Sequence, residues 1–200
     1  MRKIFYIIGK SSTGKNMIYE ALMDREDLGL MPLVPWTTRP MRSGEQDGVE
    51  YHFTDAAGLA RLEDEGRVIE KRIYHTVQGE WTYFTVDEPG VRSADGDLLG
   101  IGTLESYVKI REFYGPEKVI PIYIETGDRQ RLERAMKREG KQEKPDYEEM
   151  CRRFLADQKD FSEERLAQAG ITRRFNNDED RSICIGEAAS FILLYRDRDL

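Results

Sequence analysis

The sequence predicts an α/β fold in which a parallel sheet is flanked by helices. Two compact apolar segments, residues 4–8 and 119–124, have the composition of fully buried strands. The first segment is followed directly by a glycine-bounded loop and then by apolar residues at helical spacing, which is typical of a parallel strand–helix unit. Prolines and polar turns interrupt residues 31–53, so a smaller, mostly β insertion is expected within the α/β core.

The composition fits a folded chain and limits its partners. The chain has 200 residues, 39% of them hydrophobic, and a net charge of −7, which makes it a poor candidate for binding duplex nucleic acid. Its longest apolar run is far shorter than the ~20 residues that span a bilayer, and its apolar start is too short for a signal peptide. Cys151 and Cys184 give no disulfide framework, and we expect two buried thiols. We therefore expect a cytoplasmic protein without membrane association.

The expected insertion begins with two short strands, over residues 37–39 and 49–53, on either side of a polar turn. A helix is expected over 56–65. Residues 68–75 and 81–86 then have the pattern of two antiparallel strands around a short turn.

The parallel pattern resumes after the insertion. The expected elements are a strand over 97–101, a helix ending near 113, a strand over 119–125, helices over 129–138 and 147–167, a strand over 171–176 and a helix over 187–194. We expect one domain with three parts: a core of residues 1–33, 87–126 and 166–200, the insertion of residues 34–86, and a helical flap of residues 127–165.

The loop after the first strand matches a phosphate-binding motif. Gly9, Gly14 and Lys15 fit the pattern G-x-x-x-x-G-K between a strand and a helix. Glycines let backbone N–H groups curl around a phosphate, the helix N-terminus adds partial positive charge, and Lys15 supplies a full charge. An ordinary glycine-rich turn with a surface lysine is the plain alternative. The residues expected to bind the phosphates of a nucleoside triphosphate are Gly9, Ser11, Ser12, Thr13, Gly14, Lys15 and Asn16.

The run over residues 37–53, TTRPMRSGEQDGVEYHF, carries the most specific pattern. It closely resembles the guanylate kinase signature of T-T-R, a further arginine, G-E, D-G and Y-x-F, and the resemblance extends over most of the chain. It implies a P-loop nucleoside monophosphate kinase that transfers the γ-phosphoryl group of ATP to GMP in the presence of Mg²⁺. The insertion is then the monophosphate-binding region and the flap is a lid.

The resemblance also implies the residues that hold the acceptor. By match, Arg39, Arg42 and Tyr51 bind its monophosphate, and guanidinium forks suit phosphate oxygens. Glu70 matches the glutamate that reads guanine in that family, because a carboxylate can accept from the ring N–H and the exocyclic amine together. The alternatives are solvated arginines on a hairpin and a solvent-facing glutamate on a strand.

Arginines concentrate in the expected lid. Arg131, Arg134 and Arg138 fall at i, i+3 and i+7, and therefore on one helix face, while Arg152 and Arg153 lie on the next helix. Such a face is often only solvated, but arginines on a closing lid neutralise charge during phosphoryl transfer. With the family pattern, the expected catalytic residues are Lys15, Arg134, Arg138 and Arg153.

Several positions depart from the family pattern. Asn16 replaces the Ser or Thr that binds Mg²⁺, so it is expected to be a weak metal ligand. Pro35 stands for a base-contacting serine, Thr82–Phe84 for Tyr-Gly-Ser/Thr, and Gly100 and Gly102 for an Asp-x-Asp pair. These departures keep two alternatives open: a degenerate domain that binds nucleotides or proteins, and a kinase for another small metabolite. If they cost the site its metal shell, Gly102→Asp with Asn16→Ser is expected to raise the rate with GMP.

Overall fold

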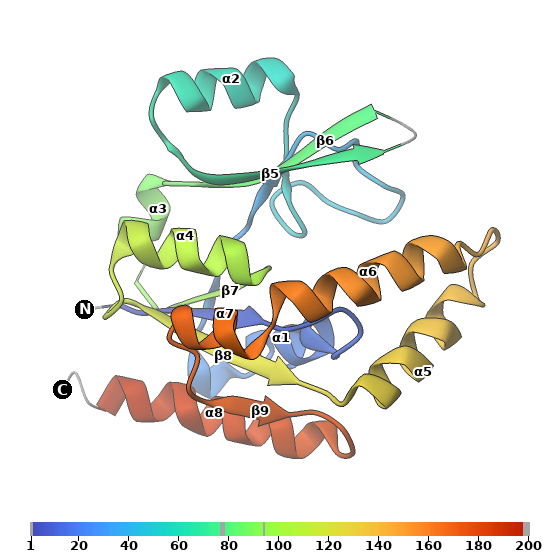
Figure 1. Cartoon of the computed structure of the whole chain (residues 1–200). Helices are drawn as coiled ribbons and strands as arrows, with labels where there is room; N and C mark the ends of the chain where they lie inside the picture. The colour runs from blue at the N-terminus through green and yellow to red at the C-terminus, as the bar shows by residue number, and fades with distance from the viewer. Residues whose placement is uncertain (1, 77–78, 94, 198–200) are drawn as a thin grey trace.

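A parallel sheet with strand order β2-β7-β1-β8-β9 forms the centre of the computed structural model (Figure 1). The structure describes residues 2–76, 79–93 and 95–197. The strands are β1 (Ile4–Ile8), β2 (Met31–Pro32), β7 (Leu98–Ile101), β8 (Val119–Glu125) and β9 (Arg174–Asn176). Because β1 lies in the middle of the sheet and is buried on both faces, its C-terminal end delivers the following glycine loop to the centre of the molecule.

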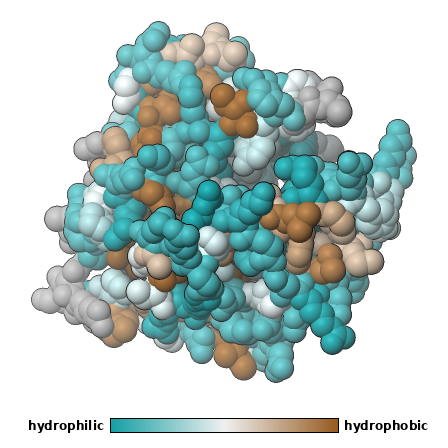
Figure 2. All heavy atoms as spheres, in the orientation of Figure 1, coloured by the Kyte–Doolittle hydropathy of each residue, from teal (hydrophilic) through white to brown (hydrophobic). Residues whose placement is uncertain are grey.

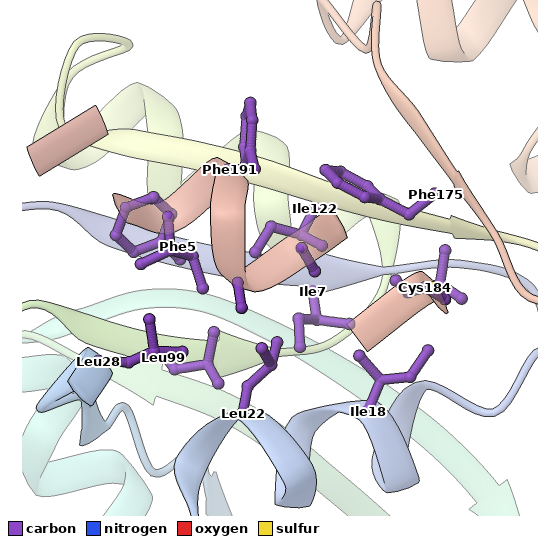
Figure 3. Packing of buried hydrophobic residues seen from close by; sticks show 14 of the residues in the cluster. Phe5, Ile7, Ile18, Leu22, Leu28, Leu99, Ile122, Phe175, Cys184 and Phe191 are labelled. Carbon is purple, nitrogen blue, oxygen red and sulfur yellow. The ribbon is translucent and has the colours of Figure 1, made fainter. Parts of the chain in front are cut away.

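Helices cover both faces of this sheet, and alternate side chains of β1 serve the two faces. Phe5 and Ile7 pack with α1 (Lys15–Met23) and α8 (Arg181–Asp197), where Figure 3 shows the buried side chains pointing toward one another. Ile4, Tyr6 and Ile8 belong to a second cluster, which includes residues of α4 (Leu104–Tyr114) and α7 (Glu163–Gln168). The sheet is therefore the middle layer of three.

A second sheet, with strand order β4-β3-β6-β5, stands apart from the core (Figure 1). Its strands are β3 (Trp36–Thr37), β4 (His52–Phe53), β5 (Val68–Thr76) and β6 (Gly79–Val86). The pair β5–β6 is antiparallel, as predicted, whereas β3 and β4 pair in parallel. α2 (Ala56–Asp64) packs Leu62 against this sheet and begins after Asp55, whose side chain accepts from the Gly58 N–H.

The remaining helices connect and extend the core. α5 (Asp128–Glu139) and α6 (Tyr147–Asp160) form a pair that extends from one side of the sheet (Figure 1). The short elements η1 (Glu26–Leu28) and α3 (Pro89–Ser93) lie before β2 and after β6.

The predicted fold class is confirmed, and the differences concern short or capped elements. The helix expected over 147–167 is divided into α6 and α7, because Ser162 accepts a bond from the Arg165 N–H and starts a new helix. β2, η1 and α3 were missed, since two to five residues carry no periodic pattern. α8 begins at Arg181, six residues before the expected start.

Cys151 is exposed, so its expected burial was wrong, while Cys184 is buried. The boundaries of core, insertion and lid stay a prediction.

The surface is mostly hydrophilic on the face shown in Figure 2, with small separate hydrophobic areas. Over the described ranges, the helices are too short or too polar to pass through a bilayer.

One tyrosine occupies the space beside two glycines at the end of the sheet. A Cβ atom at Gly100 would lie 2.6 Å from Tyr6 Cδ2, and one at Gly102 would lie 2.3 Å from Tyr6 Oη. Tyr6 is buried, and its hydroxyl lies 3.0 Å from Ser106 Oγ, so the ring has little freedom to move. The geometry therefore disfavours Gly102→Asp, because the added side chain would overlap Tyr6 and Ser106, and its expected effect on the rate with GMP stays a prediction.

We expect Gly100→Ala to lower the free energy of unfolding by about 1–3 kcal/mol, because the added methyl overlaps the Tyr6 ring. The matched control is Gly186→Ala in α8, where an added Cβ meets nothing within 4 Å. That change should be neutral or stabilise by up to about 1 kcal/mol. Urea unfolding of both variants measures the difference, and equal stabilities would contradict the packing described for Tyr6.

Candidate active site

A cleft of about 950 Å³ lies between the phosphate loop, the small sheet and the helical pair. Lys15 and Asn16 line it from the loop and the start of α1, Tyr51 from the segment that leads into β4, Arg72 from β5, and Arg153 from α6. Segments that are far apart in the sequence thus contribute to one space. The cleft is large enough for a nucleotide-sized ligand.

The loop itself has the strained backbone that a phosphate cradle requires. Ser12 has a φ of 64°, and Gly14, which precedes α1, has a φ of 91°. A Cβ at Gly9 would lie 2.4 Å from the carbonyl oxygen of Ile124, so only glycine fits there. Ser12 Oγ is buried and has no hydrogen-bond partner within the described part of the chain. Such an orphaned polar atom fits a loop built to meet a ligand.

Lys15 is held at the centre of the loop. Its Nζ donates to the carbonyl oxygens of Gly9 at 2.6 Å and Lys10 at 2.9 Å. Burial lowers the pKa of Lys15 to about 8, and Arg131, Arg138 and Arg153 add to this effect while Asp157 opposes it. The ammonium group is therefore poorly compensated before an anion binds.

A buried arginine joins the helical pair to the loop. The side chain of Arg131 in α5 is 0% exposed, and its Nε donates to the Ser11 carbonyl at 3.0 Å. Its Nη1 and Nη2 donate to Asp128 at 2.6 Å and to Asp157 at 2.8 Å. The guanidinium also lies 4.6 Å from the Phe154 ring centroid. The positions of α5 and α6 relative to the loop depend on these contacts.

Asp157 accepts a hydrogen bond from a backbone amide that a phosphate could also bind. Its Oδ2 accepts from the Ser11 backbone N–H at 2.8 Å. Backbone N–H groups of this loop are the expected phosphate donors. A carboxylate of α6 therefore lies where an anionic ligand is predicted.

The predicted lid arginines differ in their surroundings. Arg134 Nη2 donates to the carbonyl oxygens of Asn177 at 2.8 Å and Asp178 at 3.1 Å, so it is bound to the backbone. Arg138 and Arg153 are exposed and line a smaller cavity of about 190 Å³ beside Ser12. The geometry brings Lys15, Arg138 and Arg153 to one region, and Arg134 lies behind it. Their catalytic roles stay predictions.

The three predicted acceptor residues lie in the segment between β3 and β4. Arg39 is 3% exposed and pairs with Glu45 through two bonds of 2.8 and 3.0 Å. That pairing holds the pKa of Glu45 below its usual value. The guanidinium of Arg39 lies 5.4 Å from the Tyr51 ring centroid, and its Nε is buried without a partner among the residues described. Arg42 is exposed, and its backbone N–H donates to the Glu45 carboxylate.

Glu70 lies behind another arginine. Its side chain is 3% exposed, and its Oε1 accepts from Thr85 Oγ1 at 2.8 Å. Arg72 Nε donates to Oε2 at 3.0 Å, and Arg72, not Glu70, lines the large cleft. The predicted contact between Glu70 and a guanine base stays a prediction.

Asn16 is the residue predicted to bind Mg²⁺. It is exposed and lines the large cleft. No group of three or more His, Cys, Asp and Glu that could hold a metal occurs within the described ranges. An exposed amide oxygen in the cleft fits Mg²⁺ that is bound mainly by phosphates and water.

Sequence reasoning missed three residues of this region. Arg72 belongs to a charged strand segment whose sequence suggests that it faces solvent. Only the structure shows that it pairs with Glu70 and lines the cleft. Asp157 lies in a helix with many charged residues, and the sequence does not indicate which of them reaches Ser11. Tyr6 belongs to an apolar strand and looks like core. The replacement of the Asp-x-Asp pair by glycines was the one available signal for a larger neighbouring side chain.

Comparisons with known proteins agree with this architecture. Residues 1–85 match the family model for guanylate kinase. The guanylate kinase of Bordetella pertussis is 43% identical over 67 residues, which are 34% of this chain and 31% of that protein. The guanylate kinase of Paraburkholderia xenovorans is 27% identical over 154 residues, covering 76% of this chain and 64% of the relative. The match therefore spans about a third of the length of the first relative.

The fold is also similar to that of a solved guanylate kinase. The crystal structure of guanylate kinase from Anaplasma phagocytophilum matches with a TM-score of 0.61 over 96% of this chain and 85% of that chain. The sequence identity is 19%, so this likeness concerns the fold alone.

The pKa of Lys15 predicts how nucleoside triphosphate binding changes with pH. Since burial lowers this pKa to about 8, the ammonium loses its proton as pH rises through about 8, and polyphosphate loses its partner. We expect ATP affinity to be constant below about pH 7 and to fall by up to about tenfold per pH unit above 8. Calorimetric titration measures it. Lys15→Arg should flatten the profile, and an unchanged affinity at high pH in the native protein would contradict the assignment.

The buried contacts of Arg131 predict a large stability difference between two arginines of α5. Arg131→Met leaves Asp157 without its buried partner and should lower the free energy of unfolding by about 2–4 kcal/mol. Arg129→Met is the control, because the Arg129 side chain is 87% exposed and pairs only with Glu133 in the described part of α5. That change should stay within about 0.5 kcal/mol. Similar losses in denaturant unfolding would show that Arg131 does not anchor the helical pair.

Proposed function

We propose that this chain is a guanylate kinase, which transfers the γ-phosphoryl group of ATP to GMP and releases ADP and GDP; the family-model match over residues 1–85 and the similarity to guanylate kinases support this assignment. The observation that carries the proposal is the cleft, in which Lys15 after the glycine loop, Tyr51 just before β4 and Arg153 of α6 line one space. A donor phosphate at Lys15 and an acceptor phosphate at Tyr51 would share that space.

The proposed division of labour follows the location of the charges. The loop of residues 9–16 holds the ATP phosphates through its amides and Lys15. Arg39, Arg42 and Tyr51, in the monophosphate-binding region of residues 34–86, hold the acceptor phosphate. Arg138 and Arg153, in a lid of residues 127–165, neutralise the transferring group.

The chemistry needs positioning more than a base. An oxygen of the acceptor monophosphate attacks the γ-phosphorus, a new P–O bond forms, and the bond between the γ-phosphorus and the bridging oxygen of ADP breaks. The acceptor is already an anionic nucleophile, so charge neutralisation and alignment dominate. Mg²⁺ that arrives with ATP would add charge neutralisation, with Asn16 as a protein ligand.

The alternative of a degenerate binding domain is not favoured. Lys15 is retained and buried in its loop, and the relatives quoted above are guanylate kinases. A cytoplasmic location and the absence of nucleic-acid and membrane partners stay predictions.

The experiment is a coupled assay of ADP release with ATP, Mg²⁺ and a panel of nucleoside monophosphates, in which GMP is expected to be phosphorylated. Lys15→Met should lower the rate by roughly 10³-fold or more, since it removes a charge aligned with the transferring group. Its affinity for GMP should change less than about twofold, because Arg39, Arg42 and Tyr51 are untouched.

The matched control for this variant is Lys159→Met, which removes an exposed lysine from α6 and should leave the rate unchanged. Normal turnover by Lys15→Met would show that the loop is not the donor site. An equal loss of ATP and GMP binding would show that the two phosphates do not occupy separate subsites.

A further inference from the structure

Arg72 presents the charged surface of the acceptor end of the cleft. Its side chain is 15% exposed, whereas that of Glu70 is 3% exposed. Both residues lie on β5, and Arg72 lines the cleft together with Tyr51 and Thr103. Burial lowers the pKa of Arg72, but the Glu70 carboxylate and neighbouring phenols outweigh burial and raise it. A ligand in this part of the cleft therefore meets a fixed cation before it can meet the carboxylate.

Within the described part of the chain, the hydrogen bonds of Arg72 leave two of its N–H groups without a partner. Nε donates to Glu70 Oε2 at 3.0 Å, and Nη2 to Glu70 Oε1 at 3.4 Å. Nη1 lies 3.4 Å from Thr103 Oγ1. A guanidinium has five N–H groups, so one N–H on Nη1 and one on Nη2 remain. Nη1 and Nη2 are the two end nitrogens of the planar fork, which suits a ligand edge with two adjacent hydrogen-bond acceptors.

Glu70 holds this fork in place. Its two oxygens accept from Arg72, and Oε1 also accepts from Thr85 Oγ1 at 2.8 Å. A buried carboxylate with an arginine partner is stable only while the pair is intact. Glu70 is therefore oriented toward Arg72, and with only 3% of its side chain exposed it offers a base in the cleft little access to its oxygens.

From this geometry we infer that Arg72 reads the base of the acceptor nucleotide through O6 and N7 of a 6-oxopurine, with Glu70 as its positioning residue. O6 and N7 are adjacent acceptors, and arginine binds them with its fork in other macromolecular contexts. Adenine presents an N–H donor beside N7, so one donor of Arg72 would face another donor. Cytosine likewise presents an amine, and uracil has no second acceptor beside O4.

The inference rests on the proposed function, because it assumes that the acceptor phosphate is held by Arg39, Arg42 and Tyr51. A nucleoside monophosphate has a single phosphate, so a ligand placed there brings its base, not a second anion, to Arg72. The consequence for specificity is definite. The O6/N7 edge is shared by guanine and hypoxanthine, and the 2-amino group of guanine lies on the other side of the ring. GMP and inosine 5′-monophosphate should therefore be equivalent acceptors.

The test measures equilibrium binding of GMP, inosine 5′-monophosphate and AMP to the native protein by calorimetry. We expect the two 6-oxopurine nucleotides to bind within about threefold of each other, and AMP at least about tenfold more weakly. If Glu70 read guanine directly, GMP would bind far more tightly than inosine 5′-monophosphate, because hypoxanthine lacks the amine. That result would overturn the inference without any variant.

Two variants on neighbouring positions of β5 complete the test. Arg72→Lys keeps the charge beside Glu70 but loses the fork, so AMP should bind within about threefold of GMP. Lys71→Met removes a charge from the adjacent residue, whose exposed side chain pairs with Glu63, and should preserve the discrimination. Thermal unfolding checks that both variants are folded. Equal weakening of all three nucleotides by Arg72→Lys would place Arg72 at the phosphate or ribose and contradict base reading.

Binding and turnover separate this inference from the proposed function. Selective binding of 6-oxopurine nucleotides without ADP release from ATP would support the role of Arg72 and refute the kinase activity. Phosphorylation of GMP and AMP at similar efficiency, with similar affinities, would support a kinase and refute the role of Arg72.

Discussion

The arrangement of the site depends on the hydrogen bonds and ion pairs of one fully buried guanidinium, that of Arg131. It joins α5, α6 and the Ser11 carbonyl through Asp128 and Asp157, in a place where a lone charge would be strongly unfavourable. The helical pair therefore cannot move away from the loop without exposing or unpairing this group. Arg138 and Arg153 gain their positions beside Ser12 from the same anchoring. A buried structural ion pair thus fixes the elements that carry these two exposed arginines.

A carboxylate of α6, that of Asp157, is hydrogen-bonded to the glycine loop. Asp157 accepts from the Ser11 N–H, and its charge partly offsets the effect of burial on Lys15. A bound phosphate would compete for the same amide, and Asp157 would then keep only its bond to Arg131. Phosphate binding at this loop would therefore be linked to the packing of α6, because the Asp157 carboxylate contacts both the loop and Arg131 of α5.

The sequence predicted what depends on local pattern. β1 and β8 are largely apolar runs, and a glycine-bounded loop follows β1, so the fold class and the strand–loop–helix order followed from the residues. The phosphate-binding role of that loop stays a prediction. The positions of Glu70 and Arg72 relative to the cleft did not follow, because only the tertiary structure decides which of the two side chains lines it. β2 was missed for a related reason: two residues become a strand only through their neighbour β7. Tertiary contacts decided each of these cases.

Tyr6, Gly100 and Gly102 form one packing unit, and this has a consequence for how the protein can be changed. Each glycine is compatible with the tyrosine ring, and neither tolerates even a Cβ atom while the ring is present. Tyr6 in turn is tied to Ser106 on α4, so shortening it empties a space in the core. A carboxylate can enter this end of the sheet only after the tyrosine has left. Stepwise laboratory evolution would therefore have to cross an intermediate with a cavity, and the order of substitutions is dictated by packing rather than by chemistry.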